Sequence, residues 1–288
     1  MNPYLFGCLI LLAFWALTLA IVLLKGNKPN QHEFWWGSLV CSLLGFTEPL
    51  FVPAYWTPPS ILAFYRWDAE SFLFCFAIGG ISAVAPEWRL WRRSFQTLDA
   101  ALWRLVRAVL KPFRRLTGTD SPPLDEVHLT AEELKRENAL LIAIFLGSFG
   151  FTAHTGLNVI YNAALASVAM GVYIAWRRPR LRWQVWSGAL LFLLVYTAVL
   201  QVVGRIYPTF YTDHWNLKDL SGIWLLDAPI EEYIFAATLG AFWSPLYEAW
   251  RDEREAPTLA AVQPADTLQM AGIHGRRVAA NDIEHKYR

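Results

Sequence analysis

Long apolar stretches alternate with shorter polar ones along most of the chain, which is the pattern of a protein with several membrane-crossing helices. A helix that crosses the hydrocarbon core needs roughly 20 predominantly apolar residues. Seven apolar stretches are candidates for membrane-crossing helices: residues 4–24, 34–51, 68–88, 138–151, 156–176, 183–206 and 227–250. We therefore predict an all-α polytopic membrane protein with about seven transmembrane helices.

A polar segment, residues 89–137, separates the third and fourth apolar stretches. Apolar and basic residues alternate over residues 98–116, which is typical of an amphipathic helix on an anionic membrane surface. Thr130 and Glu133 form a capping box that predicts the start of the next helix, which we expect to enter the membrane near Asn138 and to end near Phe151.

Basic residues indicate the orientation, because cytoplasmic loops of membrane proteins carry an excess of Lys and Arg. Bases follow the first, third and fifth apolar stretches, whereas loops 52–67 and 207–226 contain only Arg66 and Lys218. We predict a multi-pass protein of the cell membrane with its N-terminus outside and its C-terminus in the cytoplasm. The polar tail after residue 250 is predicted to be disordered.

Composition agrees with this prediction. Hydrophobic residues make up 55% of the chain and charged residues 17%, against roughly 25% charged in soluble domains. The N-terminal stretch lacks a basic n-region and a small-residue cleavage site, so we expect a helix and not a signal peptide.

Cys8, Cys41 and Cys75 have the spacing of neither a metal site nor a disulfide framework. We find no Gly-x-Gly-x-x-Gly or P-loop stretch and expect no cofactor, no metal and no nucleic-acid partner. A homo-oligomer is left open.

Two segments of the chain resemble each other at a nearly fixed offset. The offset is 161 within the third and seventh stretches and 159 just upstream, with these pairs: Glu70 and Glu231, Phe74 and Phe235, Gly79 and Gly240, Glu87 and Glu248, Phe51 and Phe210, Trp56 and Trp215, Asp68 and Asp227. We predict two three-helix repeats, joined by one extra helix that restores the orientation and makes the repeats parallel. The predicted organisation is repeat 1–88, linker 89–137, connecting helix 138–155, repeat 156–250 and tail 251–288.

Acidic residues lie at the starts of the two paired helices, in Asp68-Ala-Glu70 and Asp227-Ala-Pro229-Ile-Glu231-Glu232. Pro229 fits a first helical turn. The acids could simply cap the helices and interact with their dipoles. An ionisable residue within a membrane segment costs roughly 2.5–3.5 kcal/mol, however, and normally faces the interior of the helix bundle. The repetition of the acids favours a shared cavity between the two helices.

Two carboxyl groups in one apolar cavity can share a proton, so that one is an acid and the other a base. Such a pair can add a proton to a substrate and remove one, and aromatic faces stabilise an intervening cation. Our catalytic candidates are Glu231, Glu232 and Glu70. The substrate-binding candidates are Trp56, Asp68, Phe74, Trp215, Trp224, Asp227, Tyr233 and Phe235. For each single aromatic residue, packing or an interfacial aromatic belt is the alternative.

The segment from Pro229 to Phe235 is similar to the Pro-x-Glu-Glu-x-x-Phe motif of membrane-integral, flavin-independent lycopene β-cyclases. These enzymes occur as heterodimers of three-helix subunits or as one fused chain, and the fused layout resembles residues 1–250. The resemblance implies cyclisation of the ends of lycopene, an apolar polyene from the bilayer, into β-rings without net redox change. An acid protonates the terminal double bond, the cation closes a six-membered ring, and a base removes a proton. The resemblance also implies that Glu231 and Glu232 are the two glutamates of the motif, and that Glu70 is the corresponding residue of the first repeat.

The first repeat departs from the motif, because Asp68-Ala-Glu70-Ser71 lacks the proline and the second acid. A different carotenoid end group and a carotenoid hydratase, in which water captures the cation, therefore stay open. Alternatives of other classes are a membrane carrier or scaffold and a Glu-Glu intramembrane metalloprotease. The protease family expects Arg four positions after the second Glu, where this chain has Ala236, and further His ligands, for which His154 is the one candidate within a helical stretch.

Overall fold

The computed structural model describes residues 2–25, 28–61, 63–64, 66–84, 104 and 131–251. We call the elements before residue 85 the first half; they are α1 (Pro3–Leu24), α2 (Lys28–Ser42), η1 (Leu43–Thr47), α3 (Glu48–Phe51), β1 (Ala63–Phe64), β2 (Trp67–Asp68) and α4 (Ala69–Ala83). A connecting helix, α6 (Ala131–Ala153), follows. The second half contains α7 (Val159–Arg177), η5 (Pro179–Leu181), α8 (Arg182–Ile206), α9 (Phe210–His214), η6 (Leu217–Asp219), β3 (Trp224–Leu225), β4 (Ala228–Pro229) and α10 (Ile230–Arg251). The predicted helical fold is confirmed for these residues.

Three of the described helical stretches are long and apolar enough to cross a membrane: Pro3–Leu24, Val159–Arg177 and Pro179–Ile206. Helix α4 is a shorter apolar helix. These features are consistent with a membrane location, and the count of seven crossings stays a prediction.

The segment 34–51, predicted as one helix, is divided in the structure. Helix α2 begins earlier, at Lys28, and ends at Ser42, after which the chain tightens into the 3-10 turn η1 and restarts as α3. Pro49 lies in the first turn of α3. Because proline has no N–H and clashes with the preceding helical turn, it disfavours a continuous helix but suits a helix start.

Helices α4 and α10 begin later than Asp68 and Asp227, the predicted starts, because a short antiparallel hairpin precedes each of them. Pro229, predicted in the first helical turn, instead lies in β4 and pairs with Trp224. The N–H of Ile230 donates to the carbonyl of Ile223 at 2.9 Å, which ties the start of α10 to its hairpin. Asp68 occupies the N-cap position of α4 but makes no side-chain capping hydrogen bond.

Helix α6 begins at Ala131, directly after the predicted capping residue Thr130, and is longer than the predicted membrane stretch 138–151. Thr130 itself, the polar linker up to residue 130 apart from Arg104, and the tail after residue 251 lie outside the described residues.

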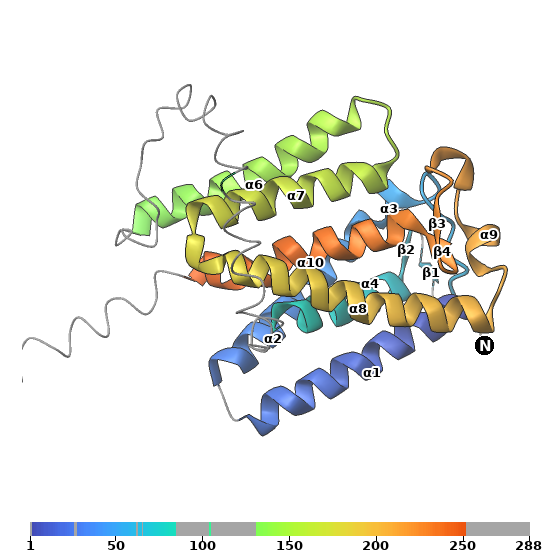
Figure 1. The fold of residues 1–288 in the computed structure, drawn as a ribbon, viewed down its shortest axis with the longest axis horizontal. Coiled ribbons are helices and arrows are strands. Elements are labelled where there is room, and N and C mark those ends of the chain that lie inside the picture. Colours follow the sequence, from blue (N-terminus) through green and yellow to red (C-terminus); the bar gives the residue numbers. More distant parts are fainter. Residues whose placement is uncertain are drawn as a thin grey trace, which may run out of the picture.

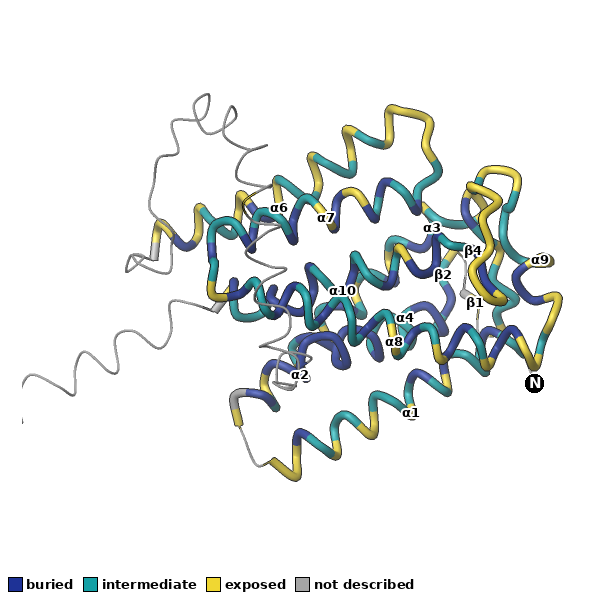
Figure 2. The backbone as a smooth tube through the Cα atoms, viewed as in Figure 1, coloured by how far each residue is buried: buried dark blue, intermediate teal, exposed yellow. Residues whose placement is uncertain are grey.

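Helices α4 and α10 lie in the middle of the bundle (Figure 1). Helix α4 packs mainly against α2 and α1, whereas α10 packs mainly against α8 and α7. Helix α6 packs against the outside of α7. Buried positions dominate α4 and α10, while α1 and α6 carry many exposed ones (Figure 2). The exposed residues include Leu17 of α1 and Leu146 of α6, which suits contact with lipid.

Glycines allow the central helices to approach their neighbours closely. A Cβ atom added at Gly79 of α4 would lie 2.3 Å from the carbonyl oxygen of Gly37 in α2. A Cβ atom added at Gly240 of α10 would lie 2.4 Å from the carbonyl oxygen of Gly188 in α8. Both helix pairs therefore cross with backbone against backbone, as small residues permit in membrane bundles.

The hairpins, α3 and α9 gather at the end of the bundle where the N-terminus lies (Figure 1). Two loops at this end, residues 52–67 and 207–226, we call the end loops. Trp56 and Trp215 pair there as an isolated antiparallel bridge. The N–H of Thr57 donates to the carbonyl of His214 at 2.7 Å, so backbone hydrogen bonds join the two halves.

Candidate functional site

A cavity of about 300 Å³ lies between the two halves, and its walls are mostly apolar and aromatic. Helix α4 contributes Ser71, Phe74, Cys75 and Ile78, and helix α10 contributes Glu232, Phe235, Leu239 and Phe242. The spacing of three and four residues places each set on one face of its helix. The predicted cavity between the helices that carry the acids is therefore present, and α1, η1, α3, α6, α7, α8 and residues of the two end loops also line it.

Glu232 is the acid of α10 that lines this cavity, and its carboxyl group is buried. It accepts hydrogen bonds from three aromatic donors. The hydroxyl of Tyr196 in α8 donates at 2.6 Å, the indole Nε1 of Trp215 donates at 2.9 Å, and the hydroxyl of Tyr55 donates to the same oxygen as Trp215. Both halves thus supply donors to one carboxyl group, which offsets the cost of burying it.

Tyr55 reaches Glu232 from the first end loop and is itself buried. Burial raises the pKa of Tyr55, and the negative charge of Glu232 raises it further. The phenol therefore stays protonated at neutral pH and keeps its role as a donor to the carboxyl group.

A second buried carboxyl group, that of Glu48 in α3, lines the same cavity. Its Oε1 accepts from the hydroxyl of Ser71 at 2.6 Å, and its Oε2 accepts from the N–H of Asp68 at 2.7 Å. The hydroxyl of Tyr4 in turn lies 2.8 Å from that of Ser71. Sequence reasoning missed Glu48, although an acid inside a predicted membrane stretch was a usable signal.

Glu70 and Glu231, the matched acids of the two repeats, are also buried but bind backbone of the end loops. Glu231 accepts from the N–H of Ser221 at 2.8 Å and from the hydroxyl of Tyr161. Glu70 accepts from the N–H of Ile61 at 2.9 Å. Among the described residues, the cavity lining includes Glu48 and Glu232 but neither of these two acids. Successive helical residues point about 100° apart, which separates Glu231 from Glu232.

Comparison with known protein families identifies the part of the chain that carries Glu232. Residues 158–250 match the lycopene cyclase family. The match spans α7 to α10, and no curated protein and no solved structure matches the chain. This family match supports a role in carotenoid cyclisation.

Four of the predicted substrate-binding residues line the cavity beside the carboxyl group of Glu232: Trp56, Phe74, Trp215 and Phe235. The rings of the two tryptophans lie 5.2 Å apart, and the two phenylalanines contact the ring of Tyr196 edge-on. These rings surround the cavity near the Tyr196–Glu232 hydrogen bond. Asp68 contributes through its backbone, which donates to Glu48.

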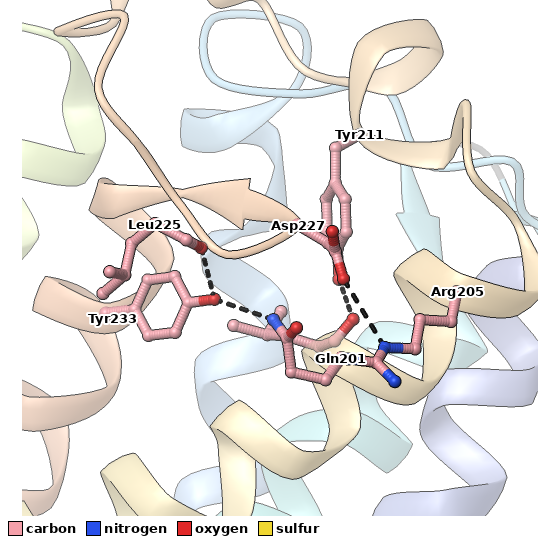
Figure 3. Close-up of polar contacts among 7 residues, drawn as sticks. Gln201, Arg205, Tyr211, Leu225, Asp227 and Tyr233 are labelled. Carbon is pink, nitrogen blue, oxygen red and sulfur yellow. Dashed lines mark hydrogen bonds and ion pairs between the residues drawn. The ribbon is translucent and has the colours of Figure 1, made fainter.

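The other three predicted substrate-binding residues do not line the cavity. The hydroxyl of Tyr233 accepts from Gln201 Nε2 at 3.0 Å and donates to the carbonyl of Leu225 at 2.8 Å (Figure 3). Asp227 faces Arg205 of α8 at 3.8 Å (Figure 3). Trp224, on β3, is 42% exposed. Tyr233 and Asp227 thus attach the β3–β4 hairpin to α8.

Proposed function

We propose that the chain is a membrane-embedded lycopene cyclase that converts the end of a linear polyene into a β-ring without net redox change. The observation that carries this proposal is Glu232. It is a buried carboxyl group with three aromatic donors, it lines an apolar cavity, and it lies within the part of the chain that matches the lycopene cyclase family.

The proposed framework has seven crossings, with the N-terminus outside and the C-terminus in the cytoplasm, arranged as two parallel three-helix repeats joined by α6. Several features support it. A hairpin precedes both α4 and α10, and both helices cross a neighbour at a glycine pair. The matched residues Trp56 and Trp215 pair with each other across the end loops.

Proton transfer drives the proposed reaction. A carboxylic acid adds a proton to the terminal double bond, the next double bond attacks the cation to close the ring, and a carboxylate removes a proton from the ring. Of the three predicted catalytic glutamates, the geometry favours Glu232, while Glu231 and Glu70 position the end loops. Faces of Trp56, Trp215, Phe74 and Phe235 stabilise the cation. Apolar walls keep water away from it, which favours cyclisation over hydration.

The substrate enters from the bilayer beside α6. This helix forms one wall of the cavity through Phe145, Leu146 and Phe149, and Leu146 is 62% exposed. Because α6 packs mainly against α7, movement of α6 can open this side of the cavity to lipid.

Expression in a bacterium that accumulates lycopene tests the function. We expect a product of unchanged mass with a β-ring spectrum, and we expect Glu232→Gln to lower its formation by about 100-fold or more, the usual contribution of a general acid or base. Glu132→Gln is the matched control, because Glu132 is exposed and pairs with the exposed Lys135 one helical turn later.

The products also discriminate between the alternatives. A product heavier by one water assigns the protein to the hydratases. Unchanged lycopene, with the protein verified in the membrane, contradicts lycopene cyclisation and favours the carrier.

A further inference from the structure

The two walls of the cavity correspond at two apolar positions and differ at a third, chemically important one. At the offset of 161, Phe74 corresponds to Phe235 and Ile78 corresponds to Leu239, and all four line the cavity. At the same offset, Ser71 corresponds to Glu232. A serine hydroxyl is a hydrogen-bonding group and not a proton donor of carboxylic strength. The wall formed by α4 therefore lacks the acid that the wall formed by α10 has.

Glu48 supplies a carboxyl group at that position. The hydroxyl of Ser71 donates to Glu48 Oε1 at 2.6 Å, so the carboxyl group lies directly against the residue that corresponds to Glu232. Glu48 reaches the cavity because the chain turns through η1 after Ser42 and restarts at α3. The turn therefore directs Glu48, near the end of the segment 34–51, toward the cavity, whereas a continuous straight helix would place this side chain elsewhere.

Hydrogen bonds hold Glu48 in place at the cavity. Its two oxygens accept from the hydroxyl of Ser71 and from the N–H of Asp68, and the side chain of Asp68 also interacts with this carboxyl group. Glu48 is therefore fixed at the border of the cavity, where a bound polyene would lie.

We propose that Glu48 is the second proton-transferring residue of the cyclase and acts together with Glu232. This inference rests on the proposed function. One of the two carboxyl groups, as the acid, gives a proton to the terminal double bond of the polyene. The ring-closing carbon–carbon bond forms, and the other group, as the carboxylate, takes a proton from the new ring. The pair holds the same number of protons before and after, as a reaction without redox change requires.

Two carboxyl groups on different walls suit this reaction, because the proton is added and removed at different carbons of one end group. Glu48 comes from the first half and Glu232 from the second. The complete site therefore contains one acid from each half, although the sequence motif lies only in the second.

The test compares Glu48→Gln, Glu48→Asp, Glu132→Gln and wild type in the lycopene-accumulating strain and as purified proteins. The measurements are product formed per amount of membrane protein, thermal unfolding in detergent, and the dependence of the rate on pH. We expect Glu48→Gln to lose about 100-fold or more of the activity. We expect Glu48→Asp, which retains a carboxyl group, to recover part of it with a shifted pH profile.

The outcomes separate the inference from the proposed function. If wild type and Glu132→Gln cyclise lycopene and Glu48→Gln does so at the same rate, Glu48 is not a proton-transferring residue, while the cyclase function stands. Equal loss of activity in Glu48→Gln and Glu48→Asp, with lowered thermal stability and an unchanged pH profile, assigns Glu48 a structural role and overturns the inference. If wild type leaves lycopene unchanged, the proposed function fails and the inference fails with it.

Discussion

At the scale of single residues, the structure differs most from expectation in the surroundings of Glu232. Its donors come from three separate segments, and Tyr55 is 177 residues away along the chain. A buried carboxyl group with so many fixed donors is held in one orientation toward the cavity. Tyr196 also packs against the aromatic lining of the cavity, because its ring contacts Phe74 and Phe235.

Loss of one donor to Glu232 should impair catalysis. Tyr196→Phe removes a hydroxyl that lies 2.6 Å from the carboxyl group while keeping the ring. A lost hydrogen bond to a buried group costs about 1–3 kcal/mol, so we expect a fall in activity of roughly 5- to 160-fold. Cyclised product per amount of membrane protein is the measurement.

Tyr173→Phe is the control for that variant. Its hydroxyl also donates to a glutamate at 2.6 Å, namely Glu137 at the side of α6. An equal fall in both variants would show that the loss reflects general stability and not the cavity.

The sequence predicted some of these residues and not others, for a geometric reason. A short motif indicated Glu231 and Glu232, but which of them faces the cavity depends on the rotation of α10. That rotation is fixed by packing, including the contact of Gly240 with α8. Tyr55, Tyr196 and Glu48 belong to segments without a motif, and folding alone brings them to the site.

At the scale of elements, the glycine crossings determine how close the helices lie. Gly188 and Gly240 leave no room for a side chain between α8 and α10, and Gly37 and Gly79 do the same for α2 and α4. Because α4 and α10 carry the cavity lining, these crossings also determine its width.

A methyl group at one crossing should destabilise the protein. In Gly240→Ala the new Cβ atom would lie 2.4 Å from the carbonyl oxygen of Gly188, so the helices must separate. Overpacking typically costs about 1–3 kcal/mol, and we expect a lower unfolding temperature in detergent together with reduced cyclisation.

Gly171→Ala is the matched control in α7, since its nearest new contact, the carbonyl oxygen of Ala241, would be an ordinary 3.7 Å away. Comparable unfolding temperatures for the two variants would show that the α8–α10 crossing tolerates expansion.

Helix interiors were more predictable than helix ends. Apolar length located most of the long helices, but the ends depend on local contacts that apolar length does not encode. Pro49 marks the restart of the chain as α3, and Pro229 was misplaced because the β3–β4 hairpin continues up to α10.

At the scale of the whole molecule, the end loops connect the two halves beside the cavity. The Trp56–Trp215 bridge and the Tyr55–Glu232 hydrogen bond both run between halves. The periodicity of the sequence predicted a cavity between matched helices. The sequence offset matched Trp56 with Trp215 but did not predict that the two would pair, because equivalent positions in two repeats need not touch.

The proposed orientation places the end loops outside the cell. Asp213 is exposed in the second end loop, and Arg180 is exposed between α7 and α8 at the other end of the bundle. We expect a membrane-impermeant thiol reagent to label Asp213→Cys in intact cells but to label Arg180→Cys only after permeabilisation.

The native Cys8 and Cys41 are buried and Cys75 is partly buried, so wild type provides the unlabelled baseline. Labelling of Arg180→Cys alone in intact cells would invert the proposed topology.

The correspondence of Ser71 with Glu232 has a consequence if the two proposed repeats arose by duplication. If both copies began alike, the acid of Glu48 could compensate when α4 lost its own, after which the copies were no longer interchangeable. Restoring Glu at position 71 would now press a third carboxyl group against Glu48 in an apolar cavity, where like charges repel strongly. Under the proposed repeat arrangement, this exchange of acids would make the two halves dependent on different carboxyl groups, so that a return to two identical halves would cost activity.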